Sequence, residues 1–229
     1  MIYFAHRGAN TQRVQNTVSA FALAHQQGAR YFELDVHLLQ DGNLAVHHDD
    51  SLASTAGIDV ALKNLTAADL KKYPLINQFT KGPEYVPLLT DVLPVLTPGL
   101  QLLNIELKND NNMYPGIEET LLRALPFQLL PRILFSSFDV PTLRRLRALL
   151  PLARLGLLTR AFDVQEALAL GAESVHINHT RFTPQLANTC HAHHLNVYCY
   201  TVNNASLAKQ LAAQGVDGIF TDDVTLFTR

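Results

Sequence analysis

Near its amino-terminal end the chain reads Phe4-Ala5-His6-Arg7-Gly8-Ala9. A short apolar run ends there in a proton-transfer group, a fixed cation and a residue suited to a tight turn. Barrels of alternating strands and helices gather their chemistry at the carboxyl ends of their strands. We therefore interpret this stretch as the end of the first buried strand of an α/β fold.

Eight short runs rich in β-branched and aromatic residues recur along the chain, and stretches of helical period separate them. This alternation is typical of parallel strands joined by right-handed crossovers. The number of strands favours a closed (β/α)₈ barrel of the TIM type over an open doubly wound sheet, which usually needs fewer. The predicted strands are residues 2–6, 31–36, 102–107, 133–137, 154–158, 174–178, 196–201 and 218–221.

One interval is far longer than a usual crossover, namely residues 38–100 between the second and third predicted strands. Within it, residues 44–47 predict the arm of a hairpin, and Thr66 predicts the start of a helix. No repeat of fixed period and no linker-like segment marks a boundary. We therefore predict a single barrel domain over residues 1–229 with a small insertion at about 38–100.

The composition narrows the class of partner. A chain of 229 residues that is 48% hydrophobic can bury a sizeable core, and a net charge of −2 provides no broad basic surface for nucleic acid or anionic lipid. The sequence has no signal-peptide pattern and no apolar run long enough to span a bilayer. We expect a cytoplasmic protein that acts on a small molecule, without nucleic acid and without stable membrane insertion. The oligomeric state stays open.

Three carboxylates fall late in two neighbouring strands. Glu33 and Asp35 are two residues apart and share a face of the second strand, and Glu106 ends the third strand together with Lys108. At the barrel mouth their mutual repulsion would raise their pKa values unless a cation is present. Oxygen-only ligands suit Mg²⁺, Ca²⁺ or Mn²⁺, and the absence of cysteine or paired histidine ligands argues against zinc.

A second imidazole follows the predicted hairpin arm. Acid–base chemistry near neutral pH needs one group that takes a proton and another that gives one. Adjacent residues of an extended arm face opposite sides, so only one of His47 and His48 can face the site with His6. We choose His48, because it leads the His48-Asp49 pair.

Taken together, these segments resemble the glycerophosphodiester phosphodiesterase family over nearly the whole chain. The matching motifs are His6-Arg7-Gly8, Asn16-Thr17, Glu33-x-Asp35-Val36, Asp41-Gly42, His48-Asp49, Glu106-Leu107-Lys108, Ser136-Ser137-Phe138, Tyr200-Thr201-Val202-Asn203 and residues 215–222. Ordered motifs in many separate segments are far more specific than any single one.

The resemblance implies a metal-dependent TIM-barrel phosphoric diester hydrolase that converts glycerophosphodiesters to sn-glycerol 3-phosphate and an alcohol. It implies one divalent cation, Mg²⁺ or Ca²⁺ with Mn²⁺ as a further option, held by Glu33, Asp35 and Glu106. The implied acid–base pair is His6 and His48. The residues implied to face the phosphate are Arg7 and Lys108.

The chain departs from the family pattern at two places. Gln15 stands where the family usually has Glu, so a charge that would orient Arg7 is replaced by a neutral amide. Residues 38–40 read Leu-Leu-Gln, where the family tends to carry Thr or Ser and Lys. Neither departure removes a proposed ligand or histidine.

Other residues and other functions remain open from the sequence. Asn203 and Asp222 follow the last two predicted strands and are candidates for substrate contact, whereas His176 either lines the mouth or is a hydrogen-bonded core residue. One rival function is a non-catalytic glycerophosphate binder, supported only by Gln15. Another is a lysophospholipase D-like activity, which calls for an exposed apolar rim; the sequence has no Trp and no basic amphipathic helix to indicate one.

Overall fold

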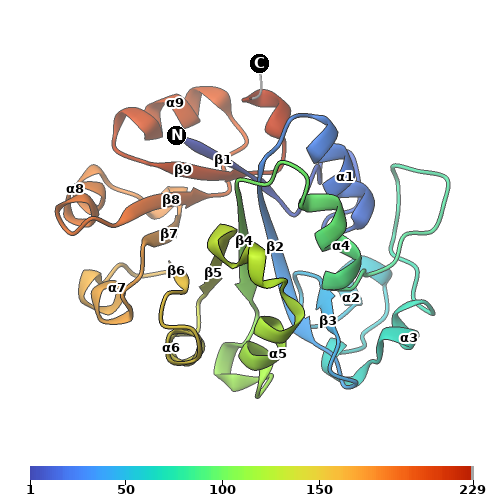
Figure 1. The fold of residues 1–229 in the computed structure, drawn as a ribbon. Coiled ribbons are helices and arrows are strands. Elements are labelled where there is room, and N and C mark those ends of the chain that lie inside the picture. Colours follow the sequence, from blue (N-terminus) through green and yellow to red (C-terminus); the bar gives the residue numbers. More distant parts are fainter. Residues whose placement is uncertain (228–229) are drawn as a thin grey trace.

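A computed structural model describes residues 1–227, in which eight parallel strands close into a ring (Figure 1). Neighbours follow the order β1-β9-β8-β7-β6-β5-β4-β2, and a β1–β2 pairing closes the ring. The strands are β1 Ile2–His6, β2 Tyr31–Leu38, β3 Leu44–Val46, β4 Leu102–Leu107, β5 Ile133–Ser137, β6 Arg154–Thr159, β7 Ser174–Asn178, β8 Asn196–Tyr200 and β9 Gly218–Thr221. The predicted TIM-type barrel is confirmed, and β3 is an extra strand that pairs antiparallel with β2 outside the ring.

The longer helices surround the strands (Figure 1). The helices are α1 Val18–Gln26, α2 Ala53–Ala56, α3 Ala67–Leu70, α4 Leu89–Leu96, α5 Ile117–Ala124, α6 Val140–Leu149, α7 Val164–Leu170, α8 Pro184–Ala192 and α9 Ala205–Ala213. Side chains cap several helix starts: Thr17 accepts a hydrogen bond from the amide of Ala20, and Asp139 accepts one from the amide of Thr142. Within residues 1–227, none of these helices has both the length and the apolar character needed to cross a membrane.

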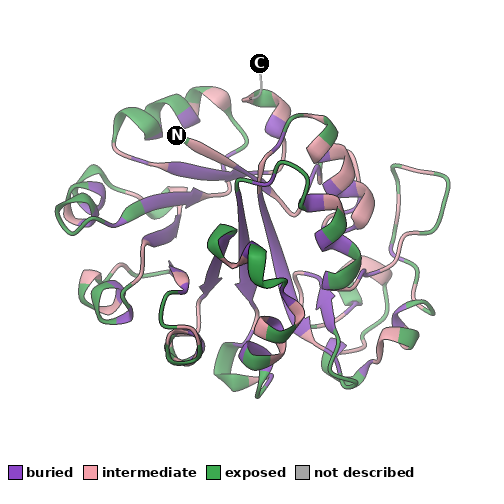
Figure 2. Ribbon diagram, in the orientation of Figure 1, coloured by how far each residue is buried: buried purple, intermediate pink, exposed green. Residues whose placement is uncertain are grey.

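The strands are buried on both faces, whereas the helices expose their outer sides (Figure 2). Because successive side chains of a strand point to opposite faces, the apolar residues separate into two layers. The larger layer packs between strands and helices and includes Phe32, Leu34 and Ile105. A smaller aromatic layer, with Phe4 and Phe220, fills the barrel interior below the mouth. The same alternation turns Glu33 and Asp35 inward.

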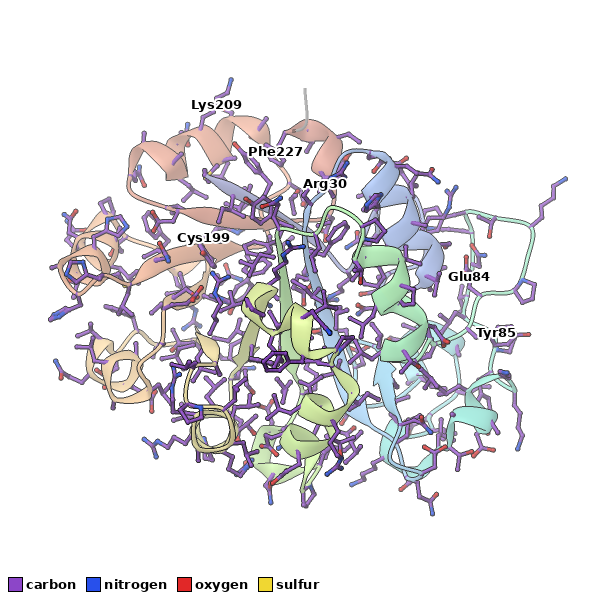
Figure 3. All side chains as sticks on the ribbon, in the orientation of Figure 1. Arg30, Glu84, Tyr85, Cys199, Lys209 and Phe227 are labelled. Carbon is purple, nitrogen blue, oxygen red and sulfur yellow. The ribbon has the colours of Figure 1, made fainter. Side chains whose placement is uncertain are left out.

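Residues 39–88, between β2 and α4, form an arm with a hydrophobic cluster of its own, whereas α4 packs in the main core. Leu39, Leu52 and Leu62 belong to that cluster and are buried apart from the main core. As predicted, residues near 44–47 form one strand of a hairpin, β3, and Thr66 caps a short helix, α3. The predicted second strand continues past Val36 to Leu38, because its last residues pair with β3. Glu84, labelled in Figure 3, ties the arm to α1 by accepting a hydrogen bond of 2.6 Å from Ser19.

Candidate active site

A strained turn after β1 brings His6 and Arg7 to the barrel mouth. Arg7 has a φ of 58° and Gly8 a φ of 83°, both in the left-handed region. A Cβ atom at Gly8 would lie 2.6 Å from the backbone carbonyl carbon of Ala20, so only glycine fits here. The amide of Arg7 points at Glu33, 3.1 Å from its carbonyl oxygen and 3.1 Å from its Oε2. The turn therefore joins the end of β1 to the end of β2.

Three buried carboxylates from β2 and β4 form the centre of the site. Glu33, Asp35 and Glu106 each place an oxygen within 4.8 Å of the others, and the strand register sets Asp35 opposite Glu106. Lys108 Nζ lies 3.0 Å from Asp35 Oδ1 and 2.5 Å from Glu106 Oε1. Arg7 Nε lies 3.2 Å from Asp35 Oδ2. Three carboxylates thus face two fixed cations.

Burial opposes ionisation of these carboxyl groups, with different outcomes. At Asp35 the Lys108 ammonium and the Arg7 guanidinium outweigh burial and hold the pKa well below its usual range. At Glu33, burial and the nearby Asp35 carboxylate raise the pKa well above its usual value, and burial also raises the pKa of Glu106. A hard divalent cation would offset this cost, and the all-oxygen donor set fits Mg²⁺ or Ca²⁺.

His6 is held by a carboxylate from the far end of the chain. Its Nδ1 lies 2.7 Å from Asp222 Oδ1, and Asp222 also accepts hydrogen bonds of 2.6 Å from Asn10 and of 2.6 Å from Asn203. Because a carboxylate only accepts, Nδ1 carries the hydrogen and Nε2 faces the carboxylate cluster, 4.0 Å from Glu33 Oε2. Burial lowers the pKa of His6 despite the bond to Asp222. Burial raises the pKa of Asp222, but the bond and charge of His6 together with the bonds from Asn10 and Asn203 outweigh burial and lower that pKa to about 2.

His48 has a carboxylate partner next to it in the sequence. Its Nδ1 lies 2.6 Å from Asp49 Oδ1, and Ser54 donates a hydrogen bond to the other oxygen of Asp49. Nε2 of His48 is therefore free to face the pocket. Burial lowers the pKa of His48, although its side chain remains 38% exposed. His47 is buried and bonds instead to the carbonyl of Asp49 and the hydroxyl of Thr55.

A central pocket of about 100 Å³ gathers the predicted site residues. Six of them line it, and they are His6, Arg7, Glu33, His48, Glu106 and Lys108. Asp35 is fully buried and contacts both Arg7 and Lys108. Two wider pockets adjoin the centre. One, of about 490 Å³, is lined by His6, Arg7 and side chains of the arm, and the other, of about 460 Å³, continues from His48 towards Phe138 and Arg160.

Several contacts in the site could not be predicted from the sequence. Gln15 accepts a hydrogen bond of 2.7 Å from Arg7 Nη1, so the amide that replaces the usual Glu still holds the arginine. Asp222 contacts His6, a role that sequence reasoning did not assign to it. His176 is fully buried and bonds to Ser174 Oγ at 2.9 Å, and burial lowers its pKa to about 3. It is a core histidine that also reaches the floor of the central pocket.

Comparison with known proteins agrees with this geometry. A sequence model of the Glycerophosphoryl diester phosphodiesterase family matches residues 6–226. A glycerophosphodiester phosphodiesterase of Bacillus altitudinis is 36% identical over 228 residues, covering 96% of this chain and 93% of that protein. One from Caldanaerobacter subterraneus subsp. tengcongensis is 32% identical, covering 97% and 94%. A solved phosphodiesterase of Oleispira antarctica, in complex with the product sn-glycerol-3-phosphate, superposes with a TM-score of 0.83 at 29% identity, covering 97% of this chain and 93% of that one.

Proposed function

The chain belongs to the glycerophosphoryl diester phosphodiesterase family, whose members are phosphoric diester hydrolases, and from this premise we propose its reaction and the residues that perform it. The chain hydrolyses glycerophosphodiesters to sn-glycerol 3-phosphate and an alcohol. The observation that carries the proposal is the central pocket, towards which two carboxylate-bonded histidines turn their Nε2 atoms, one from the end of β1 and the other from the loop after β3. The full-length match to glycerophosphodiester phosphodiesterases supports the substrate class.

The phosphodiester binds among the cations at the mouth. Glu33, Asp35 and Glu106 would hold a divalent cation, which would supply positive charge to neutralise the phosphate oxygens. Arg7 Nε lies 3.2 Å from Asp35 Oδ2, and Lys108 Nζ lies 3.0 Å from Asp35 Oδ1. Both side chains face the same pocket. Such fixed donors stabilise the negative charge that builds up in the transition state, because they need little reorganisation.

The two histidines divide the proton transfers. One Nε2 accepts a proton from the nucleophile while the other, in its protonated form, donates a proton to the departing alkoxide. Asp222 and Asp49 fix the Nδ1–H form of each ring, so that Nε2 is the atom available for chemistry. The nucleophile is either water or the neighbouring glycerol hydroxyl. Attack by the hydroxyl passes through a cyclic phosphate, and attack by water does not.

Phosphorus NMR of the purified protein tests the reaction. Glycerophosphocholine is added after chelation and again after readdition of Mg²⁺ or Ca²⁺. We expect a glycerol 3-phosphate signal only in the metal-containing samples, and an early cyclic phosphate signal would identify the hydroxyl as nucleophile. Binding of substrate without turnover in every sample would contradict the proposal and support a non-catalytic glycerophosphate binder.

A lysophospholipase D-like activity is the second candidate, because the structure contains an apolar rim that the sequence did not indicate. Ile76 is 66% exposed and Phe79 is 37% exposed, and both line the pocket of about 490 Å³ that also contains His6 and Arg7. Exposed apolar side chains beside an active site are suited to an apolar part of a substrate. Here the occupant is the acyl chain of a lysophospholipid.

Paired substrates separate the two activities. The Ile76→Ser/Phe79→Ser double variant is expected to lose most of its kcat/KM for monomeric lysophosphatidylcholine and to keep that for glycerophosphocholine. Phe127→Ser is the matched control, because Phe127 is 81% exposed and lies in the turn that precedes β5, outside the site. If the wild-type protein cleaves only glycerophosphocholine, the second candidate is wrong and the first stands.

A further inference from the structure

Two buried histidines contact the loop that carries His48, and the proposed reaction uses neither of them. His37 belongs to β2, and His47 directly follows β3. Both side chains are buried, and their ring centroids are 6.4 Å apart. His48 and Asp49 lie outside the strands, so the hydrogen bonds of the barrel do not hold their carbonyl groups.

His37 contacts the backbone of His48 directly. Its Nε2 lies 3.2 Å from the carbonyl oxygen of His48, and its Nδ1 lies 2.9 Å from the hydroxyl of Tyr114. A carbonyl oxygen only accepts hydrogen bonds, so the hydrogen must be on Nε2. A neutral imidazole has a single N–H, which leaves Nδ1 to accept from the Tyr114 hydroxyl. The contacts therefore select the Nε2–H tautomer.

His47 makes the corresponding contact with Asp49, but with the roles of its two ring nitrogens exchanged. Its Nδ1 lies 2.8 Å from the carbonyl oxygen of Asp49, and its Nε2 lies 2.8 Å from Oγ1 of Thr55 in α2. By the same reasoning the hydrogen is on Nδ1, and the Thr55 hydroxyl donates to Nε2. Neighbouring histidines thus take opposite tautomers, and each donates to one of two consecutive carbonyl groups.

We propose that His37 and His47 form a clamp of positioning residues that fixes the backbone of His48 and Asp49, so that Nε2 of His48 stays aimed at the scissile phosphate. This inference rests on the acid–base role proposed above for His48. The segment needs such support, because the His48 side chain is 38% exposed and its carboxylate partner is on the same loop. Small misplacements of a catalytic group lower kcat strongly, so support from the backbone side affects the rate.

Opposite tautomers predict opposite tolerances to amide substitution. The side-chain nitrogen of Gln reaches to about the position of Nε2, and that of Asn to about the position of Nδ1. His37→Gln and His47→Asn therefore keep a donor for the carbonyl, whereas His37→Asn and His47→Gln lose it. We expect the first two variants to keep kcat for glycerophosphocholine within about threefold of wild type and the other two to lose about 10–100-fold, with KM little changed.

Nitrogen-15 NMR of histidine-labelled wild-type protein measures the tautomers without any substitution or turnover. We expect a protonated Nε2 on His37 and a protonated Nδ1 on His47. Tyr114→Phe removes the hydroxyl at Nδ1 of His37 and should change the signals of that ring alone, and Thr55→Val should do the same for His47. The same tautomer in both rings, or equal losses in all four amide variants, would overturn the clamp. Failure of the wild type to cleave any glycerophosphodiester would contradict the proposed function and leave the tautomer assignment as an independent result.

Discussion

The two halves of the site are built in different ways. His6 is fixed by Asp222, which lies 216 positions away and meets it because the last strand closes the barrel against the first. His48 is fixed by its neighbour Asp49, on an arm that has its own hydrophobic cluster. The His6 side chain is 15% exposed and that of His48 is 38% exposed. The carboxylate that fixes His6 therefore comes from the opposite end of the chain, whereas the carboxylate that fixes His48 is local to the arm.

The barrel half is therefore the more rigid part of the site, and the arm half is the more accessible part. The barrel half contains the buried carboxylates and both fixed cations, which any change in strand register would disrupt. The arm half can change its surroundings with less effect on the barrel, and it also supplies the exposed rim residues Ile76 and Phe79. We expect variation in substrate preference to arise in the arm, and loss of folding to follow from changes in the barrel.

The largest effect expected is from removing either histidine. His6→Ala and His48→Ala should each lower kcat for glycerophosphocholine by about 10²–10⁴-fold, because each removes a proposed general acid or base. Added imidazole should restore activity more fully to His48→Ala, since the vacated position is more exposed there. Steady-state kinetics with and without imidazole give both quantities. Near-normal activity of either variant would remove that histidine from the mechanism, and equal rescue would contradict the contrast between buried and accessible halves.

The carboxylate partners should have smaller and unequal effects. In Asp222→Asn the amide can donate to Nδ1 of His6 and so place the ring hydrogen on Nε2, which is the wrong tautomer for a base. We expect a loss of about 100-fold in kcat for Asp222→Asn and of about tenfold for Asp49→Asn, because water reaches Asp49 and partly replaces its contact. Circular dichroism of both variants checks that the fold is retained. A larger loss at Asp49 would reverse the proposed ranking.

The two aspartates, Asp49 and Asp222, differ in whether their histidine partner could be predicted from the sequence. Strand periodicity and the order of motifs predicted the barrel and the approach of Glu33, Asp35 and Glu106, because strands of fixed pitch and parallel direction determine which side chains share a mouth. Asp49 could be associated with His48 because the two are adjacent. The contact between Asp222 and His6 could not be foreseen, since it depends on how a closed barrel aligns its first and last strands. The sequence alone makes Asp222 only a candidate for substrate contact.

The clamp around His48 was hidden for a related reason. Sequence reasoning treated His47 as a competitor of His48 and did not single out His37. The structure gives both of them partners from other elements, namely Tyr114 beyond β4 and Thr55 in α2. Hydrogen-bond partners of this kind depend on how side chains from separate elements are placed, which periodicity does not report.

Metal binding should stabilise the barrel half, and more strongly at higher pH. Burial raises the pKa of Glu33 and of Glu106, so protons stabilise the metal-free fold at low pH and this contribution is lost as the pH rises through those raised values. A divalent cation replaces the protons, so its effect should be greater at pH 7.5 than at pH 5. At a hundredfold excess over Kd and pH 7.5, about 2.7 kcal/mol of stabilisation corresponds to a rise in Tm of about 5–10 °C.

Thermal unfolding with Ca²⁺, Mg²⁺ or a chelator measures this shift. Glu106→Gln should abolish it, and His48→Ala should keep it, because the proposed ligands belong to the barrel and not to the arm. A larger shift at pH 5 than at pH 7.5 would show that the cation does not compete with protons at these carboxylates.

The smallest effect expected is at Gln15, where the barrel half departs from its family. Gln15 accepts a hydrogen bond of 2.7 Å from Arg7 Nη1, and Arg7 Nε lies 3.2 Å from Asp35 Oδ2. The guanidinium therefore already contacts one carboxylate and one neutral acceptor. In Gln15→Glu a second carboxylate would compete with the substrate phosphate for the same cation. We expect KM for glycerophosphocholine to rise about two- to fivefold with kcat nearly unchanged, because the added charge affects ground-state binding and transition-state binding alike.

Gln15→Leu is the control: it removes the acceptor, frees Arg7 to move, and should lower kcat instead. If Gln15→Glu lowers kcat and leaves KM unchanged, Arg7 acts on the transition state alone and the amide has no role in tuning phosphate affinity.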